Sequence, residues 1–282
     1  MKILVTGGAG FIGTHLVDKL LEQNHEVLVF DNLSTGKIDN VRKDAAFIKG
    51  NVVDKCDIDK LPKDFDAVYH LAGLLDVVGS FENPSLWTQV NVVGTSNMLE
   101  FCRENNIKKF VYASSCCSTQ PFSSPYALSK YLPEYYCKLY KELYGINTTS
   151  VRFYNVYGEY MPTEGFKLVI SIFLEQFRKN LPLTIVGDGE QTRDYIYAGD
   201  IANGLFKCLD YNGNNPIFNL GTGKSVSINE IISMFGNPST VNLPDRGEPK
   251  HMVPADTSIV KNELNWEPKT NMRNWIQNAI QK

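Results

Sequence analysis

Short apolar runs alternate with amphipathic stretches through the first half of the chain. Runs rich in apolar residues occur at 2–6, 27–30, 46–49, 66–70, 109–113 and 147–153, and they predict short buried strands. Apolar residues recur at helical spacing at about 11–21, 84–105 and 125–144, which predicts helices there. Repeated β–α units of this kind predict a doubly wound parallel sheet, an α/β fold whose site lies at the carboxyl ends of the strands.

The pattern changes after Gly158. Polar loops separate short predicted strands at 183–186 and 217–220 from predicted helices at about 166–179, 228–235 and 271–281. We therefore expect a first domain over residues 1–157, with a return segment at about 191–220. Residues 158–190 and 221–282 are expected to form a smaller lobe. Pro133 falls inside the predicted helix 125–144, where it is expected to kink the helix or remove a hydrogen bond.

A glycine-rich turn joins the first predicted strand to the first predicted helix. Residues 8–13, Gly-Ala-Gly-Phe-Ile-Gly, fit the G-x-G-x-x-G pattern, whose glycines let the backbone approach a pyrophosphate at a helix N-terminus. Asp31 ends the second strand, where a carboxylate accepts hydrogen bonds from ribose hydroxyls and repels the 2′-phosphate of NADP. The sequence thus predicts NAD; a tight turn without a cofactor is the alternative.

Two residues near the start of the helix 125–144 have the spacing of an acid–base pair. Tyr126 and Lys130 form a Y-x-x-x-K pattern, which puts both side chains on one helix face. An ammonium beside a phenol favours the phenolate, so Tyr126 is a candidate general base or acid. Ser115 ends the preceding strand and can hydrogen-bond the same substrate oxygen. The alternatives are a Tyr that packs on the domain and a Ser that bonds its own backbone.

Other polar residues suggest contacts with cofactor or substrate. Asn91 lies inside the helix 84–105, ahead of a glycine, which indicates close packing or a cofactor contact; a position on the helix surface is the alternative. Asn155 follows a strand and can donate to a phosphate or sugar. Arg193 and Arg246 lie in polar loops and suit the diphosphate of a nucleotide sugar, although each can equally form a surface ion pair.

The composition of the chain limits which classes of partner are expected. The net charge of −3 over 282 residues gives no basic field, so nucleic acid is not an expected partner. The longest apolar runs are shorter than the roughly 18 residues of a membrane span, so no membrane partner is expected. Six cysteines without metal-type spacing predict no metal site and suit a reducing, cytoplasmic location.

These motifs, in this order, resemble the NAD-dependent epimerase/dehydratase group of the extended short-chain dehydrogenase/reductases, which contains nucleotide-sugar 4-epimerases. The resemblance covers nearly the whole chain. The segments that carry it are Thr6–Gly13, Asp31-Asn32, His70–Ala72, Asn91–Thr95, Ala113–Ser115, Ser124–Lys130, Arg152–Gly158, Gly187–Tyr195, Asn219–Gly223 and Trp266–Pro268.

The resemblance implies a Rossmann domain that holds NAD, a nucleotide-sugar substrate and a homodimer formed by the helices at 84–105 and 125–144. Implied NAD contacts are Gly7, Gly10, Phe11, Ile12, Gly13, Asp31, Asn32, Asn51, Val52, Leu71, Ala72, Asn91, Tyr126 and Lys130. Tyr126 and Ser115 would act on the sugar 4-hydroxyl, with Lys130 completing the catalytic set. Asn155, Arg193 and Arg246 would hold the nucleotide diphosphate.

The chain departs from the family pattern at three places. Cys116 and Cys117 stand where dehydratases and decarboxylases carry acidic residues, which argues against those reactions. Only ten residues separate Ser115 from Tyr126, so a shortened loop is expected to leave the sugar site more open. Asn51 replaces the usual Asp near adenine, and its amide oxygen can still accept from the adenine amino group.

The sequence favours a 4-epimerase acting on a UDP-hexose, UDP-hexosamine or UDP-uronic acid through a transient 4-keto sugar. Two alternatives stay open. One is a 4-ketosugar reductase or other nucleotide-sugar dehydrogenase, which would release its nicotinamide. The other is a non-catalytic protein that binds NAD or nucleotides.

Overall fold

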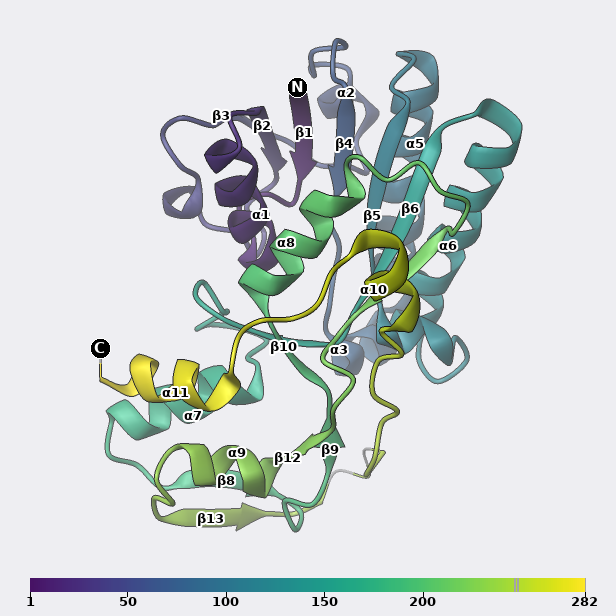
Figure 1. Cartoon of the computed structure of the whole chain (residues 1–282). Coiled ribbons are helices and arrows are strands. Elements are labelled where there is room, and N and C mark those ends of the chain that lie inside the picture. Colours follow the sequence, from purple (N-terminus) through teal and green to yellow (C-terminus); the bar gives the residue numbers. More distant parts are fainter. Residues whose placement is uncertain (246, 248, 282) are drawn as a thin grey trace.

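A seven-stranded parallel sheet forms the upper part of the molecule (Figure 1). The computed structural model describes residues 1–245, 247 and 249–281. Across the sheet the strands run in the order β11 (Ile217–Leu220), β6 (Asn147–Phe153), β5 (Lys109–Ser115), β4 (Ala67–His70), β1 (Lys2–Thr6), β2 (Glu26–Asp31) and β3 (Ala46–Lys49). All neighbouring pairs in this sheet are parallel. The predicted doubly wound parallel sheet is therefore confirmed.

The strand order reverses beside β1. The chain builds β1, β2 and β3 outward on one side, then crosses back to add β4, β5 and β6 on the other. Connections that leave β1 and β4 therefore diverge at the carboxyl ends of these strands. Such a switch point opens a crevice, and this is where α/β proteins bind their ligands.

Helices cover both faces of the sheet. On one face lie α1 (Phe11–Glu22), α8 (Ala198–Cys208) and α10 (Ser258–Leu264); on the other lie α2 (Lys55–Ile58), α5 (Gly94–Glu104) and α6 (Pro125–Tyr144). Every residue of β5 is buried, as expected for a strand covered on both sides. Helices α8 and α10 are not predicted by the sequence pattern. They pack against α1 and β11 respectively.

The predicted helix at 84–105 is a continuous helical segment of three parts. It starts with α4 (Pro84–Trp87), continues as a π-helical stretch (Thr88–Val93) and ends as α5; a short helix, α3 (Val77–Glu82), precedes it. Elsewhere in the described residues, 3₁₀ turns occur at Ile38–Asn40 and Cys116–Thr119. A π-helical stretch widens the helix locally, and such stretches are common at functional sites.

Helix α6 has the predicted bounds and clear end signals. The Ser124 side chain caps the N-terminus by accepting a hydrogen bond from the Ala127 backbone N–H at 3.0 Å. Pro125 occupies the first turn, and Gly145 ends the helix in a left-handed conformation with φ of 66°. The helix continues through Pro133. Because proline has no N–H, it can donate no hydrogen bond to the carbonyl one turn back.

The lower lobe consists of small two-stranded sheets and three helices (Figure 1). Its pairs are β8 (Leu183–Val186) with β13 (Thr240–Leu243), β9 (Thr192–Arg193) with β12 (Val226–Ser227), and β10 (Tyr195–Tyr197) with β7 (Asn155–Tyr157). The helices are α7 (Val169–Arg178), α9 (Ile228–Met234) and α11 (Met272–Ile280). Buried Phe173, Ile231 and Ile276 join these elements in a separate apolar core.

The chain passes between the two parts more than once. After β10 it forms α8, which packs against α1, and β11, which pairs in parallel with β6 at the edge of the large sheet. Later, Trp266 is buried in the upper core and donates its indole N–H to the Asp200 carbonyl at 3.0 Å. The two parts are thus interleaved along the sequence.

None of the helices in the described part of the chain is long and apolar enough to span a membrane. All six cysteines are free thiols. Among the described residues, no group of three or more His, Cys, Asp or Glu side chains is arranged to hold a metal ion.

Candidate active site

The glycine turn after β1 is packed too tightly for side chains. A Cβ on Gly13 would lie 2.1 Å from the Gly7 carbonyl oxygen, and a Cβ on Gly7 would lie 2.6 Å from the Ala72 nitrogen. Gly7 also has a φ of +71°, which favours glycine. Gly10 provides no side-chain cap for α1, and the first turn of α1 has no acidic residue. The first-turn amides therefore have no intrahelical or side-chain acceptor, which fits a pyrophosphate.

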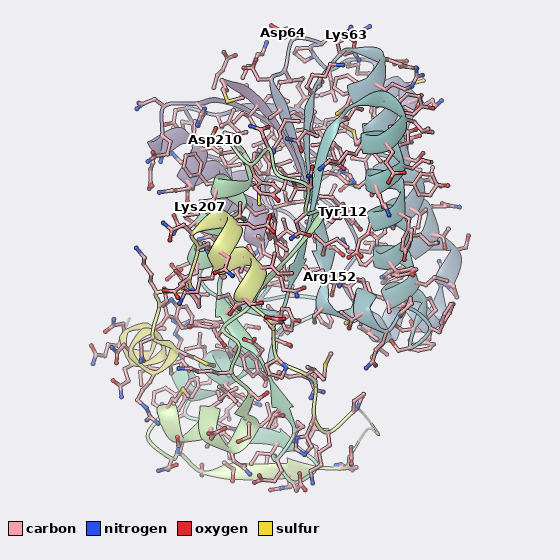
Figure 2. The ribbon with its side chains drawn as sticks, turned by 45° about the vertical axis from the view of Figure 1, so that its right-hand side comes forward. Lys63, Asp64, Tyr112, Arg152, Lys207 and Asp210 are labelled. Atoms are coloured by element: carbon pink, nitrogen blue, oxygen red, sulfur yellow. The ribbon has the colours of Figure 1, made fainter. Side chains whose placement is uncertain are left out.

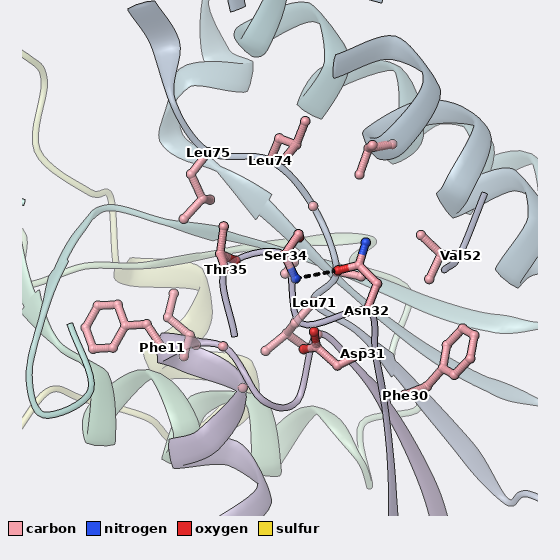
Figure 3. A pocket seen from close by; sticks show the side chains of 18 of the residues that line it. Phe11, Phe30, Asp31, Asn32, Ser34, Thr35, Val52, Leu71, Leu74 and Leu75 are labelled. Atoms are coloured by element: carbon pink, nitrogen blue, oxygen red, sulfur yellow. Dashed lines mark hydrogen bonds between the residues drawn. The ribbon is translucent and has the colours of Figure 1, made fainter. Parts of the chain in front are cut away.

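A pocket opens from this turn along the carboxyl ends of β1, β2, β4 and β5 (Figure 3). Twelve of the predicted cofactor residues line it: Gly7, Gly10, Phe11, Ile12, Gly13, Asp31, Asn32, Asn51, Val52, Leu71, Ala72 and Lys130. The lining includes both the glycine turn and Lys130. The pocket thus links the pyrophosphate position to the Y-x-x-x-K motif, as a bound dinucleotide would require.

Asp31 supports the adenosine end of this pocket. Its two carboxylate oxygens accept hydrogen bonds from the backbone N–H groups of Ala9 at 3.1 Å and Leu33 at 2.8 Å. Burial raises the pKa of Asp31, and these two hydrogen bonds act in the opposite direction. Each oxygen retains acceptor capacity for a ribose hydroxyl. The neighbouring Asn32 oxygen accepts from the Ser34 N–H at 2.9 Å (Figure 3).

Asn51 has an acceptor that is partly used within the protein. Its side-chain oxygen accepts from the Val53 N–H at 3.1 Å, while its own backbone N–H donates to Asp57 at 3.0 Å. A carbonyl oxygen can accept twice, so one lone pair remains for the adenine amino group.

Asn91 is buried behind the pocket wall and is not a surface residue. Its side-chain oxygen accepts from the Leu74 N–H at 2.8 Å, and its amide nitrogen donates to the Leu74 carbonyl at 3.1 Å and to the Ser129 hydroxyl at 2.9 Å. The amide thereby joins the loop after β4 to α6. Asn91 and Tyr126 are not among the residues that line the pocket.

The Ser115 hydroxyl lies near the Tyr126 phenol and can hydrogen-bond its deprotonated form, which acts to lower the pKa of Tyr126. Both are buried, and the Tyr126 N–H donates to the Ser80 hydroxyl at 3.1 Å, which ties the start of α6 to α3. Burial raises the pKa of Tyr126, whereas the hydrogen bond from Ser115 lowers it. The phenol is therefore protonated without ligands, and a nearby positive charge is needed to make it a base.

Lys130 is a buried residue in the lining of the pocket. Its ammonium donates to the Ala113 carbonyl at 3.0 Å and lies 5.4 Å from the centre of the Tyr112 ring. Burial lowers the pKa of Lys130 to about 8. The ammonium remains the major form at neutral pH, so its charge is available to a phenolate one helical turn away.

Two thiols lie next to Ser115. Cys117 N–H donates to the Ser115 hydroxyl at 3.2 Å. A hydrogen bond from the Cys116 thiol lowers the pKa of Cys117, with smaller contributions from Ser115 and from the positive charge of Arg193. These relations place Arg193 near the same end of β5, although it belongs to the lower lobe. The substrate side of the site therefore lies between the two parts of the molecule.

The predicted substrate residues differ in how the structure places them. Arg193 is buried in β9, where its guanidinium donates to the Thr192 carbonyl at 2.8 Å. Asn155 begins β7, and its N–H donates to the Asp194 carbonyl at 2.9 Å. Arg246 lies outside the described residues.

Several pocket residues are absent from the sequence prediction. They are Phe30, Ser34, Thr35, Gly50, Gly73, Leu74, Leu75, Leu86, Val90, Ala113, Ser114 and Phe153. Ser34 and Thr35 had a usable signal, because they lie in the polar turn directly after Asp31. Leu74, Leu75 and Leu86 had none, since they are ordinary apolar residues that face the pocket only in the folded chain.

Comparison with known proteins agrees with this geometry. A sequence model of the NAD dependent epimerase/dehydratase family matches residues 3–221. The chain belongs to this family. Over 301 aligned residues it is 39% identical to a putative UDP-glucose 4-epimerase of Methanocaldococcus jannaschii, with 99% of this chain and 97% of that protein covered. The family resemblance expected from the motifs is confirmed.

Two solved structures of UDP-glucose 4-epimerases are similar over their full length. The Thermotoga maritima enzyme with UDP-glucose has a TM-score of 0.93 and 31% identity, covering 100% of this chain and 98% of that chain. The Thermus thermophilus enzyme in complex with NAD has a TM-score of 0.90 and 34% identity, with the same coverage. The Rossmann fold of the family and its NAD dependence agree with the pocket described above.

Proposed function

We propose that this chain is an NAD-dependent epimerase that inverts C4 of a nucleotide-activated sugar, a UDP-hexose, UDP-hexosamine or UDP-uronic acid. The observation that carries the proposal is the pair Ser115 and Tyr126, one helical turn from Lys130, which itself lines a pocket that fits NAD. Relatives named as UDP-glucose 4-epimerases across the whole chain support the same reaction.

The chain's own residues move the proton. When bound, NAD supplies a reversible oxidant for the sugar C4. The Tyr126 phenolate takes the proton of the 4-hydroxyl as that carbon is oxidised to a ketone, and it returns the proton after the ketone has turned its other face. Ser115 hydrogen-bonds the same oxygen and holds it at Tyr126. The Lys130 ammonium stabilises the phenolate.

The nucleotide is held from the lower lobe in this proposal. Arg193 lies near Cys117 and Ser115 and can contribute its guanidinium to the diphosphate, together with Asn155 and Arg246. We assign residues 1–157 and about 191–220 to the NAD domain, and 158–190 and 221–282 to the nucleotide-sugar lobe. The exceptions are the short strands β7, β9 and β10, which pair within the lower lobe, and α10 with Trp266, which pack in the upper core. A firm hold on the diphosphate and a loose hold on the sugar allow the ketone to turn.

Loss of water or CO₂ is disfavoured by the residues after Ser115. Those reactions need an acid–base carboxylate near C5 or C6. Here Cys116 and Cys117 follow Ser115, and the connection to Tyr126 contains the neutral residues 118–125. A simple oxidation and return at C4 needs no such group.

The proposal predicts that the two C4 epimers of a UDP-sugar interconvert without net consumption of NAD. Purified protein loaded with NAD would be incubated with UDP-glucose, UDP-N-acetylglucosamine, UDP-glucuronic acid and the C4 epimer of each, and the products separated by chromatography. Conversion in both directions to one equilibrium ratio is expected for at least one pair. Stoichiometric reduction of added NAD by one of these sugars would instead identify a dehydrogenase, and stoichiometric oxidation of NADH or NADPH by a UDP-4-ketosugar would identify a reductase. Absence of conversion for every pair, with NAD bound, would contradict the epimerase.

We further propose a homodimer formed by α5 and α6. A stripe on α6 exposes Leu132, Tyr135, Tyr136, Leu139 and Leu143 at helical spacing. Exposed apolar stripes of this kind commonly mark protein interfaces. The six free thiols support a reducing, cytoplasmic location.

A further inference from the structure

A buried carboxylate that the reaction does not use lies one helical turn beyond Lys130. The Glu134 side chain is 1% exposed. One of its oxygens accepts from the Arg152 Nε at 2.8 Å and the other from Arg152 Nη2 at 2.6 Å. The Ser114 hydroxyl donates to the first oxygen at 2.5 Å, and the Ser118 Oγ lies 2.7 Å from it. Each of these hydrogen-bond partners is a charged or hydroxyl group inside the protein.

These contacts connect four elements around the reactive residues. Tyr126, Lys130 and Glu134 follow each other at four-residue spacing on one face of α6. The partners of Glu134 come from the end of β5, the 3₁₀ turn after it, and β6, where Arg152 is the register partner of Ser114. Figure 2 shows Arg152 near the lower end of the large domain, below Tyr112. The carboxylate therefore ties α6 to the segment that contains Ser115.

We propose that Glu134, held by Arg152, is a positioning residue for this reaction: it fixes the Ser115 segment against Tyr126 and keeps a negative charge beside Lys130. The proposal rests on the proposed epimerase function. Ser118 shows how the first effect is transmitted. Its hydroxyl lies 2.7 Å from both the Glu134 carboxylate and the Ser115 carbonyl oxygen, so its single proton is donated to one or the other and the hydroxyl is held between them.

The electrostatic effect has a defined direction. Burial lowers the pKa of Lys130, and the charge of Glu134 raises it. The other ionisable groups around Lys130 carry no charge that would raise its pKa. Tyr112 of β5 and Tyr126 are neutral phenols. Burial lowers the pKa of His70 in β4 to about 3, so its ring is uncharged.

An ordinary structural ion pair would give some of the same effects on stability. Removing one partner of a buried pair leaves an uncompensated charge, which typically destabilises a protein strongly. Loss of activity in Glu134→Gln alone would therefore be ambiguous. The double variant Glu134→Gln/Arg152→Met removes both charges together and avoids that problem.

Three variants separate positioning from charge. In Glu134→Gln/Arg152→Met we expect kcat to fall about 100-fold with KM little changed, because Ser114 and Ser118 then hold the Ser115 segment through weaker, neutral hydrogen bonds. The alkaline limb of the kcat profile should move to lower pH, since Lys130 loses its proton earlier. Ser114→Ala/Ser118→Ala should lower kcat without moving that limb. The control Lys109→Met changes a buried cation at the other end of β5 and should change neither.

A measurement without turnover makes the test independent of the reaction. The pKa of the Lys130 ammonium would be followed by NMR of lysine labelled at the side-chain nitrogen, with and without NAD. It should be lower in the double variant than in the wild type. Unchanged kcat and an unchanged Lys130 pKa in a folded double variant would overturn the proposal. If the Lys130 pKa is lowered in the double variant but the wild type converts no UDP-sugar, the proposed epimerase function is refuted instead.

Discussion

At the scale of single residues, burial sets the chemistry of the site. Tyr126, Lys130 and Glu134 share one face of α6, yet each is nearly inaccessible to water. Burial disfavours the charged form of Tyr126 and of Lys130. The protein therefore relies on neighbouring groups to restore the charges that proton transfer needs. Ser115 supplies a hydrogen bond to Tyr126, and Glu134 supplies a charge to Lys130.

Tyr126→Phe tests the assigned base. It removes one oxygen from a buried ring, so the fold and NAD binding should be preserved. We expect epimerisation to fall by about 10²–10⁴-fold, the usual contribution of general acid–base catalysis. Activity assays with UDP-sugars and the absorbance of bound NAD after denaturation would check this. Full activity in the variant would remove Tyr126 from the mechanism.

A pH effect on stability is expected from Lys109. This lysine is buried at the start of β5, where its ammonium donates to the Tyr211 carbonyl. Burial lowers its pKa from 10.5 to about 8. Between about pH 8 and 10.5 the unfolded chain therefore binds more protons than the folded chain, so this residue's contribution to the free energy of unfolding rises with pH.

The comparison is with Lys109→Met, which lacks the titrating group. Urea unfolding of both proteins at several pH values would give the difference in their free energies of unfolding. Wild type should gain stability relative to the variant from about pH 8 to 10.5. A difference that does not change with pH would show that the lysine keeps its ordinary pKa in the folded chain.

At the scale of elements, local signals predicted those parts that depend on local chemistry. The glycine turn, the capped helix α6 and the apolar strands are encoded by neighbouring residues, and all are found as predicted. Helix α8 was missed because tertiary contacts stabilise it: it packs on α1, and its buried Asp200 accepts from the N–H groups of Lys269 and Thr270, far along the chain.

The residues of the site also divide into those that local sequence reveals and those that depend on tertiary contacts. The Tyr126–Lys130 spacing is visible in the sequence, whereas the role of Glu134 depends on Arg152 and Ser114, which α6 meets only after folding. A carboxylate at the same four-residue spacing beyond Lys130 was the available signal. The spacing alone gave no reason to separate Glu134 from the other charged residues of the helix.

Gly13→Ala tests the turn between β1 and α1. Its Cβ would lie 2.1 Å from the Gly7 carbonyl oxygen, so the backbone of the turn must move. We expect a loss of about 1–3 kcal/mol of stability and a marked loss of NAD affinity. Gly145→Ala is the matched control, because its Cβ meets nothing within 4 Å and only its positive φ is strained. Calorimetric NAD titration should separate the two variants. Equal NAD affinities would contradict the assignment of the turn.

At the scale of the whole molecule, the upper domain and lower lobe each have their own core, while the site combines residues from both. Ser115 and Tyr126 belong to the upper domain, whereas Arg193 belongs to β9 in the lobe. The relative placement of the two parts therefore controls how the nucleotide sugar meets the reactive groups. The repeated passage of the chain between the parts limits how far they can separate.

The proposed dimer predicts a change of mass in one surface variant. Leu139→Glu places a charge in the middle of the apolar stripe on α6, where the side chain is 44% exposed. Light scattering after size-exclusion chromatography should give a dimer for wild type and a monomer for the variant. Lys138→Glu, beside it on the helix, is the control. A monomeric wild type at micromolar concentration would contradict the interface.

The late position of β11 has a consequence for synthesis on the ribosome. Strand β6 ends at Phe153, but its outer neighbour is completed only at Leu220. At about 5–20 residues per second, translation of the intervening stretch takes roughly 3–13 s, during which β6 is an open edge with unpaired backbone groups. Such an edge can form hydrogen bonds with strands of other nascent chains. Delayed or truncated synthesis between these two strands should therefore promote aggregation more than truncation within the final helix.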